Sequence, residues 1–200
     1  MKKNVVADTS FFICHACNLK SYDLLHQYLD LYTFHAGPII TQRELPHLGT
    51  QNEEIRSKIS IRNNNYTELF KALSPRTSDH LTHDGEYEAI GIAIELSLTQ
   101  DLHCLILDDN GPKNFAKNHI APLFPELSGK IHGTVGFIAN SHRIDKLNPK
   151  SNCIDHLKAI YQAYLTYQAS GKPQRPCGMD PTFVRTTLLP LISELENSNE

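Results

Sequence analysis

Six acidic residues stand where an apolar run ends or where a helix-like stretch begins. They are Asp8, Glu44, Glu86, Glu88, Asp108 and Asp109. Asp8 directly follows the apolar run 5–7, and Asp108 directly follows the run 104–107. Because the carboxyl ends of parallel strands meet at one edge of an open α/β sheet, such acids can converge although they are far apart in the chain. Converging carboxylates repel one another, and a hard divalent cation such as Mg²⁺ or Mn²⁺ relieves that repulsion. The pattern therefore predicts a carboxylate metal site.

The spacing of apolar residues predicts the elements that position these acids. Strands are expected at 5–8, 39–40 and 102–107, and a short strand or turn at 130–133. Helices are expected at 10–18, 22–31, 84–98, 112–119 and 134–141. Thr41 is a suitable N-cap for a helix that carries Glu44. The segment 51–82 stays open, since 53–61 and 66–73 suit helices whereas 58–61 also suits an edge strand. This alternation predicts an α/β fold with a central parallel sheet and helices on both faces.

The amino-acid composition limits the classes of protein to which the chain can belong. With 200 residues, of which 40% are hydrophobic and 20% charged, the chain resembles one globular domain with a small appendage. The net charge of −3 gives no general attraction to nucleic acid, which argues mildly against a nucleic-acid binder. Acids gathered in one site would account for part of that charge. Basic residues close in sequence to the acidic elements, and hence candidates for phosphate contact, include Arg43, Lys113 and Lys117.

Cysteine usage and hydropathy predict the compartment. No stretch has the length of a membrane span, and Asp8 interrupts the apolar run after the basic start, so neither an anchor nor a signal peptide is expected. The five cysteines are odd in number and irregularly spaced, which favours reduced thiols. Cys14 and Cys17 are spaced like half of a zinc site, but no second such pair follows. We expect a cytoplasmic protein without a membrane partner.

The last quarter of the chain has a different residue pattern from the rest. Apolar residues recur at helical spacing in 154–165 and in 182–195, on either side of the proline-rich segment 170–181. We therefore divide the chain into a domain of residues 1–150 and a helical extension of residues 151–200. The extension is predicted to serve assembly, such as a homodimer, or partner binding, and to contribute no metal ligand. The alternative is that its helices complete the core.

Four motifs together resemble the PIN-domain family. Val-Val-Ala-Asp-Thr-Ser at 5–10 is similar to the opening strand of that family, which carries Asp followed by Thr or Ser. Gly-Glu-Tyr-Glu-Ala-Ile at 85–90 resembles the Gly-Glu-x-Glu-Ala-Ile helix start of one PIN subgroup. Leu-Ile-Leu-Asp-Asp at 105–109 and Gly-Thr-Val-Gly at 133–136 resemble its next strand and following turn. Four pieces in this order, over roughly three-quarters of the chain, are a more specific signal than any one alone. Gly-Pro at 111–112 departs from the basic residues that the subgroup often has there.

The resemblance implies a PIN-like three-layer sandwich with a Mg²⁺ or Mn²⁺ site that cleaves RNA phosphodiester bonds. Asp8 matches the first acid of the family, with Thr9 or Ser10 as the supporting hydroxyl. The later acids are matched by Glu44, by Glu86 with Glu88 as competitor, and by Asp108 with Asp109 as competitor. Since two residues along a helix turn a side chain by about 200°, Glu86 and Glu88 cannot face one metal equally well.

The expected function is a metal-dependent endoribonuclease. Many PIN domains are toxins of bacterial toxin–antitoxin pairs, so an antitoxin protein is a candidate partner besides RNA. Divalent ions held by carboxylates lower the pKa of a nucleophilic water and neutralise charge on phosphate oxygens, which suits this reaction. The alternative is a catalytically weak PIN-like module that binds RNA or protein through its C-terminal helices.

Overall fold

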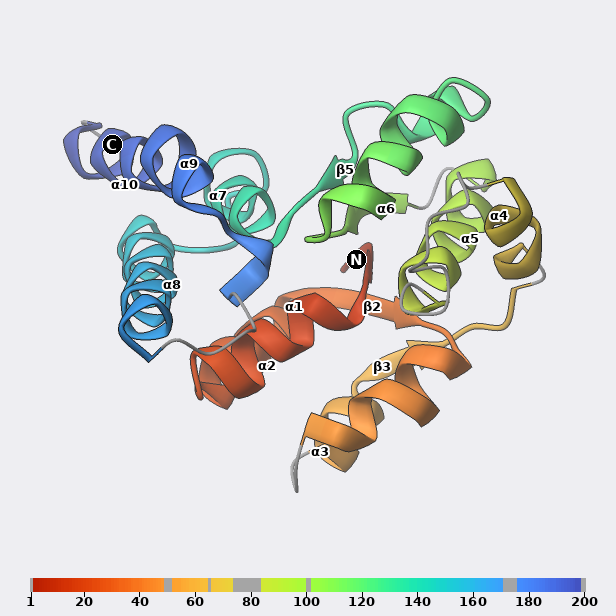
Figure 1. Ribbon diagram of the computed structural model, residues 1–200, viewed down its shortest axis with the longest axis horizontal. Helices are drawn as coiled ribbons and strands as arrows, with labels where there is room; N and C mark the ends of the chain where they lie inside the picture. Colours follow the sequence, from red (N-terminus) through yellow and green to blue (C-terminus); the bar gives the residue numbers. More distant parts are fainter. Residues whose placement is uncertain are drawn as a thin grey trace.

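A parallel sheet lies at the centre of the computed structural model, which describes residues 2–48, 52–64, 66–73, 84–99, 102–170 and 176–198 (Figure 1). Within these residues the sheet has five strands in the order β3-β2-β1-β4-β5. The strands are β1 (Lys3–Ala7), β2 (Tyr32–Ala36), β3 (Ile59–Ile61), β4 (Leu102–Ile106) and β5 (Ile131–His132). The chain runs outward from β1 through β2 to β3, and then returns to the other side of β1 for β4 and β5. The direction of winding therefore reverses between β1 and β4.

Helices and helical turns connect the strands. Those in the first half are α1 (Thr9–Ile13), η1 (Cys14–Asn18), α2 (Tyr22–Leu31), η2 (Ile39–Glu44), η3 (Leu45–Leu48), α3 (Asn52–Ser57), α4 (Thr67–Leu73) and α5 (Asp84–Leu98). Those in the second half are α6 (Asn110–Phe115), η4 (Ala116–Ile120), η5 (Pro125–Leu127), α7 (Thr134–Arg143), α8 (Lys150–Ser170), η6 (Pro176–Gly178), α9 (Pro181–Phe183), η7 (Val184–Leu188) and α10 (Leu189–Asn197).

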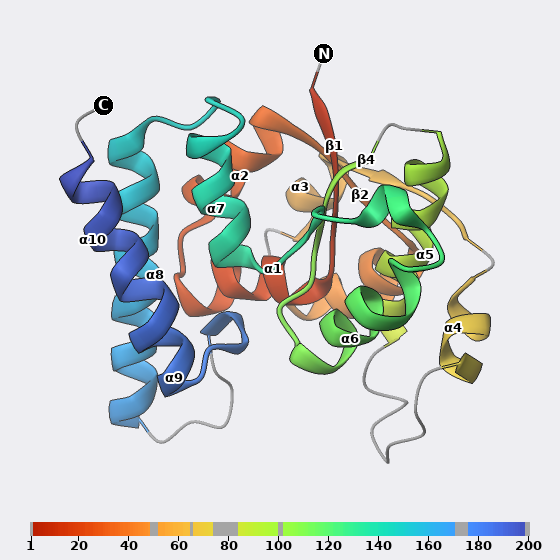
Figure 2. The ribbon, with the colours of Figure 1, turned by 90° about the horizontal axis from the view of Figure 1, so that it is seen from above.

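Helices cover both faces of the sheet (Figures 1 and 2). On one face Phe11 of α1 stacks on Phe34 of β2, with ring centroids 5.2 Å apart, and Phe137 of α7 packs against both rings. On the other face α5 packs against β1, β2 and β4. Consecutive residues of β1, including Val5 and Val6, are fully buried, as expected for a strand covered on both sides. The predicted α/β class with a parallel sheet is confirmed.

The sequence placed the second strand incorrectly. The strand is Tyr32–Ala36, whereas Ile39 begins η2 directly after Gly37 and Pro38. Pro38 favours the start of a helix because its φ angle is fixed and its missing N–H has no helical partner there. Thr41 is consequently inside the helical segment rather than its N-cap, and its hydroxyl donates to the carbonyl oxygen of Gly37 at 2.8 Å.

The described part of the segment 51–82, which the sequence left open, contains both helices and a strand. The helix α3 ends at Ser57, and β3 follows at Ile59–Ile61 as an edge strand paired with β2. The edge-strand alternative for residues 58–61 is therefore confirmed.

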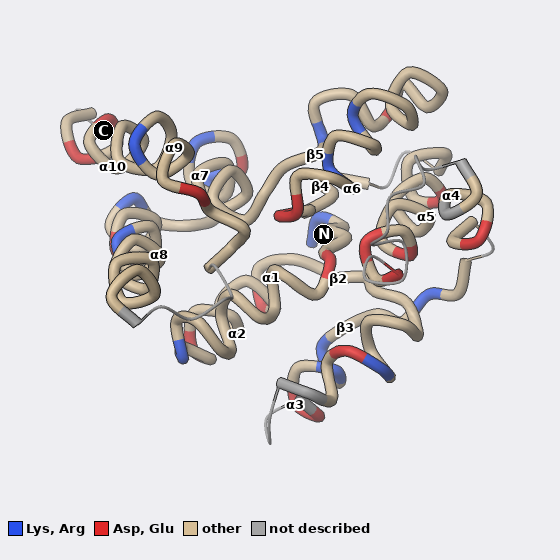
Figure 3. Tube along the Cα trace, in the orientation of Figure 1, with Lys and Arg blue, Asp and Glu red and all other residues tan. Residues whose placement is uncertain are grey.

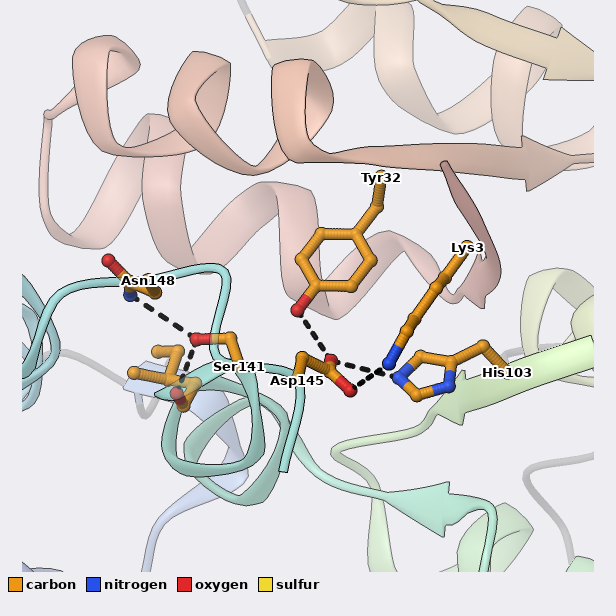
Figure 4. A network of polar contacts seen from close by, with 7 residues as sticks. Lys3, Tyr32, His103, Ser141, Asp145 and Asn148 are labelled. Carbon is orange, nitrogen blue, oxygen red and sulfur yellow. Dashed lines mark hydrogen bonds and ion pairs between the residues drawn. The ribbon is translucent and has the colours of Figure 1, made fainter. Parts of the chain in front are cut away.

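A polar network joins the opposite, amino edge of the sheet to the end of α7 (Figure 4). The side chain of Asp145 is 1% exposed and accepts hydrogen bonds from Lys3 Nζ at 2.6 Å, Tyr32 Oη at 2.6 Å and His103 Nε2 at 2.9 Å. Burial raises the pKa of Asp145, but these hydrogen bonds more than offset it and hold the pKa below its ordinary value. The network ties the amino ends of three strands together.

The C-terminal extension packs on the sheet domain instead of standing apart from it. Figure 2 shows α8 and α10 lying alongside α7, and Leu157, Leu188 and Leu195 are buried in the same apolar cluster as β1. A disulfide between Cys14 and Cys177 joins η1 to η6. The prediction that all thiols are reduced is therefore wrong for this pair, because folding brings together cysteines that lie 163 residues apart. Among the helices that the structure describes, none combines the length and apolarity needed to cross a membrane.

Candidate functional site

Asp8 and Asp108 lie together where the winding of the sheet reverses. Asp8 directly follows β1, and Asp108 is the second residue after the adjacent strand β4. Both therefore lie at the carboxyl ends of the strands, where open α/β sheets bind ligands. Asp8 is 0% and Asp108 5% exposed, and the backbone N–H of Asp108 donates to Asp8 Oδ2 at 3.2 Å. The other oxygen of Asp8 accepts from Phe11 N at 3.2 Å, so this residue also caps α1. The predicted convergence of these two acids is thus present in the fold.

Thr134 holds the carboxylate of Asp108 from the start of α7. Its backbone N–H donates to Oδ1 at 2.7 Å, and its hydroxyl donates to Oδ2 at 2.7 Å. A Cβ atom at Gly133 would lie 3.1 Å from Asp108 Oδ1, so the glycine leaves room for this contact. The sequence did not identify Thr134 as a site residue. The signal was the Gly-Thr pair after β5, which we interpreted only as a turn.

Glu44 reaches the site from η2. Its Oε2 accepts a hydrogen bond from the hydroxyl of Thr9, the residue after Asp8. A Cβ atom at Gly85 would lie only 2.5 Å from Glu44 Oε2, so the absence of a side chain there allows Glu44 to approach the first turn of α5. Burial raises the pKa of Glu44, and the charges of Glu86 and Glu88 add to this effect. Of the two hydroxyls predicted to support the site, Thr9 makes this contact. No hydrogen bond among the described residues joins Ser10 to the acids.

Glu86 and Glu88 face different neighbours. Glu86 is nearly buried at the first turn of α5, and its charge raises the pKa of Asp8. Both carboxylate oxygens of Glu88 instead accept backbone hydrogen bonds at the start of η2, from Ile39 N and Ile40 N, each at 3.0 Å. Glu88 therefore caps η2 and fixes the turn that carries Glu44.

Asp109 lies at the N-cap position of α6, and its charge contributes to the raised pKa of Asp108. The basic candidates are distributed around this strand end. Lys113 Nζ donates to the carbonyl oxygen of Asp108 at 3.2 Å, and burial lowers the pKa of Lys113. Lys117 is exposed on η4, and the charge of Arg43 acts on the pKa of Glu88. Lys113 thus directly contacts a residue of the acidic group.

The electrostatics of the acidic group match its burial. Desolvation raises the pKa of Asp8 well above its ordinary value, and the charges of Asp108 and Glu86 raise it further. Burial likewise raises the pKa of Asp108 to about 6, although hydrogen bonds from Thr134 and the charge of Lys113 oppose this. Figure 3 shows the acidic segments after β1, after β4 and in α5 gathered near the middle of the view. Such a group holds excess negative potential that a cation would relieve.

The donor set suits a hard divalent cation, since it consists of carboxylates from four separate segments: the end of β1, η2, the start of α5 and the end of β4. In the part of the chain that the structure describes, no group of three or more His, Cys, Asp or Glu side chains is already spaced as metal ligands. The carboxylates instead hold protein donors, as the contacts of Thr9 with Glu44 and of Thr134 with Asp108 show. Each carboxylate oxygen has a second lone pair, so a cation could bind there while these hydrogen bonds persist.

No protein-family model, no curated protein and no solved structure matches the chain.

Proposed function

We propose that this protein is a metal-dependent endoribonuclease with a PIN-like three-layer fold, which hydrolyses phosphodiester bonds in single-stranded RNA. The observation that carries the proposal is the buried carboxylate pair Asp8–Asp108 at the reversal point of the sheet, with Glu86 close enough to raise the pKa of Asp8. Perturbed carboxylates in this position favour a functional site over a purely structural one. The family resemblance extends the proposal to a toxin that is controlled by an antitoxin.

The residues that would hold Mg²⁺ or Mn²⁺ are Asp8, Glu44, Glu86 and Asp108. A bound ion of this kind lowers the pKa of a water nucleophile and neutralises charge on the phosphate oxygens. Mg²⁺ tolerates a small number of protein ligands because it keeps several waters and contacts substrate phosphates. This accommodates a site in which only part of the acidic group binds the ion directly.

The remaining residues would position these ligands. Thr9 orients the carboxylate of Glu44, and Thr134 orients both oxygens of Asp108. Lys113, which is half-buried beside Asp108, is placed to contact a phosphate oxygen of the substrate. Such supporting contacts typically account for about 10- to 100-fold in metal affinity or activity.

The test is cleavage of a labelled single-stranded RNA with Mn²⁺, with Mg²⁺ or with EDTA. Asp8→Asn keeps the shape and the helix-capping oxygen but removes the charge. We expect its activity to fall by more than about 100-fold, because loss of a ligand exceeds the about 10- to 100-fold cost of losing a supporting residue. Asp30→Asn, which removes an exposed carboxylate outside the site, is the control. Undiminished cleavage by a folded Asp8→Asn protein would sink the proposal.

One observation favours a second candidate, a catalytically weak module that binds RNA or protein. The described residues hold no ready-made group of three metal ligands. The two candidates differ in their response to Mn²⁺, since a ligand present at 100 times its Kd stabilises the folded state by about 2.7 kcal/mol. A metal-dependent enzyme should therefore show a rise in Tm that is lost in Asp8→Asn, whereas a binding module without a metal site should show none.

A further inference from the structure

A groove of about 300 Å³ opens beside Asp108, between the sheet domain and the C-terminal extension. One wall comes from α6 and η4, where Asn110, Lys113 and Lys117 line it. The opposite wall comes from the extension, where Met179 and Phe183 line it. The groove is therefore basic and polar on one side, whereas the other side is mainly apolar but also carries Asp180 and Thr187. Asp108, an acid of the proposed site, lines it as well.

We propose that this groove binds one nucleobase of a single-stranded RNA substrate, in the nucleotide next to the scissile phosphate. The inference rests on the proposed function. Single-stranded RNA is recognised mainly through splayed bases that stack on aromatic side chains and form hydrogen bonds along their edges. Phe183 supplies an aromatic ring, and Asn110 supplies a side-chain amide that can both donate and accept. Lys113 and Lys117 supply charges suited to the adjoining phosphates.

The size of the groove supports a single base. A volume of about 300 Å³ lies at the lower end of ligand pockets, which span about 300–1,000 Å³. Its continuity with Asp108 places the bound base within one nucleotide of the acidic group. The occupant is thus a base of the reacting strand and not a separate ligand.

The wall contributed by the extension is fixed relative to the acids. The disulfide from Cys14 holds Cys177, which itself lines the groove. Gly178 has φ +61°, and a Cβ atom there would lie 3.0 Å from the carbonyl oxygen of Asp108. The carboxylate of Asp180 accepts from Phe183 N at 2.8 Å and so caps the turn that carries the ring. A preorganised wall of this kind lowers the entropic cost of binding a base. The extension thereby acquires a role in substrate recognition, which goes beyond assembly.

The test is an abasic scan of a cleavable RNA oligonucleotide. A set of substrates, each lacking the base at one position around the cleavage point, is compared by kcat/KM. Because base stacking on an aromatic ring is typically worth a factor of about 5 to 150, we expect one position at which removal of the base costs at least about 5-fold. In Phe183→Leu, which keeps an apolar side chain against the core, that penalty should largely disappear. Phe124→Leu is the matched control, since Phe124 is also partly buried against the core but does not line the groove.

The outcomes separate this proposal from the proposed function. If wild type cleaves every abasic substrate equally, or if Phe183→Leu keeps the wild-type profile, base binding in the groove is overturned while the nuclease stands. If Phe124→Leu loses the positional penalty as well, the effect is one of packing and the assignment to Phe183 is overturned. If wild type cleaves none of the substrates with Mn²⁺ or Mg²⁺, both proposals fall.

Discussion

Replacement of Asp108 by asparagine should stabilise the metal-free protein at neutral pH. Burial raises the pKa of Asp108 from 3.8 to about 6, which means that the folded state disfavours the charged carboxylate. Asparagine has the same shape without the charge. Its oxygen can accept from the N–H of Thr134, and its amide can donate to the hydroxyl that now donates to Asp108. The substitution thus removes the cost of the buried charge and keeps the local contacts.

The size of the effect follows from the pKa values. Since a tenfold change in proton affinity is worth about 1.4 kcal/mol, the difference between 3.8 and about 6 corresponds to about 3 kcal/mol. A raised folded-state pKa means that the protonated acid is compatible with folding below pH 4. The penalty then grows as the pH rises towards 6 and is complete above it. Asp108→Asn should therefore exceed wild type by about 3 kcal/mol at pH 7.5 but by only about 1 kcal/mol at pH 4.5.

Urea unfolding in EDTA at these two pH values measures the difference directly. The comparison needs wild type, Asp108→Asn and the surface control Asp30→Asn, whose exposed carboxylate forms an ion pair with Lys58. The control should show no stabilisation at either pH. A gain from Asp108→Asn that is the same at both pH values would refute the electrostatic explanation, because only a titrating group makes the gain depend on pH. Destabilisation at pH 7.5 would show that the charge of Asp108 is paired in the metal-free protein.

Three further outcomes follow from particular contacts. Gly85→Ala places a Cβ atom 2.5 Å from an oxygen of Glu44, so the carboxylate must turn away and activity should fall. Its Tm should stay level or rise, because alanine favours a helix over glycine by up to about 1 kcal/mol. Glu86→Gln should lower activity more than Glu88→Gln does, whereas Glu88→Gln should lower the free energy of unfolding by about 1.5–3 kcal/mol through its weakened cap on η2. Cys14→Ser should destabilise the oxidised protein by up to about 5 kcal/mol, given a loop of 163 residues, and reduction of wild type with dithiothreitol should reproduce the loss in urea unfolding.

The sequence predicted those parts of the fold that depend on local pattern. The apolar runs that end at Asp8 and Asp108 are short and unbroken, so both strand ends could be placed and their meeting at one edge anticipated. The second strand was missed because Tyr32 follows the helical spacing of α2 and looks like its last turn, although it begins β2. Local spacing cannot distinguish the end of a helix from the start of a strand when the junction has no breaker.

Contacts between segments that lie far apart in the chain could not be predicted from the sequence. The Cys14–Cys177 disulfide depends on the extension returning to η1, and no spacing rule gives the pairing of two cysteines among five. The role of Thr134 has the same origin, because its hydroxyl can donate a hydrogen bond to Asp108 only when β5 pairs with β4. The groove is a third case, since its two walls are formed by segments that lie about sixty residues apart in the sequence.

For the two glutamates of α5, the geometry of the helix predicts more than the spacing of its apolar residues does. This helix is buried almost all round, so its apolar residues mark no single face and cannot say which acid points at the site. The rotation of about 200° between residues two apart still requires Glu86 and Glu88 to face different neighbours. The structure bears this out, since the charge of Glu86 acts on Asp8 while Glu88 bonds the backbone of η2. The two roles are complementary, because η2 carries Glu44, and Glu88 therefore holds in place the segment that brings a further acid to Glu86.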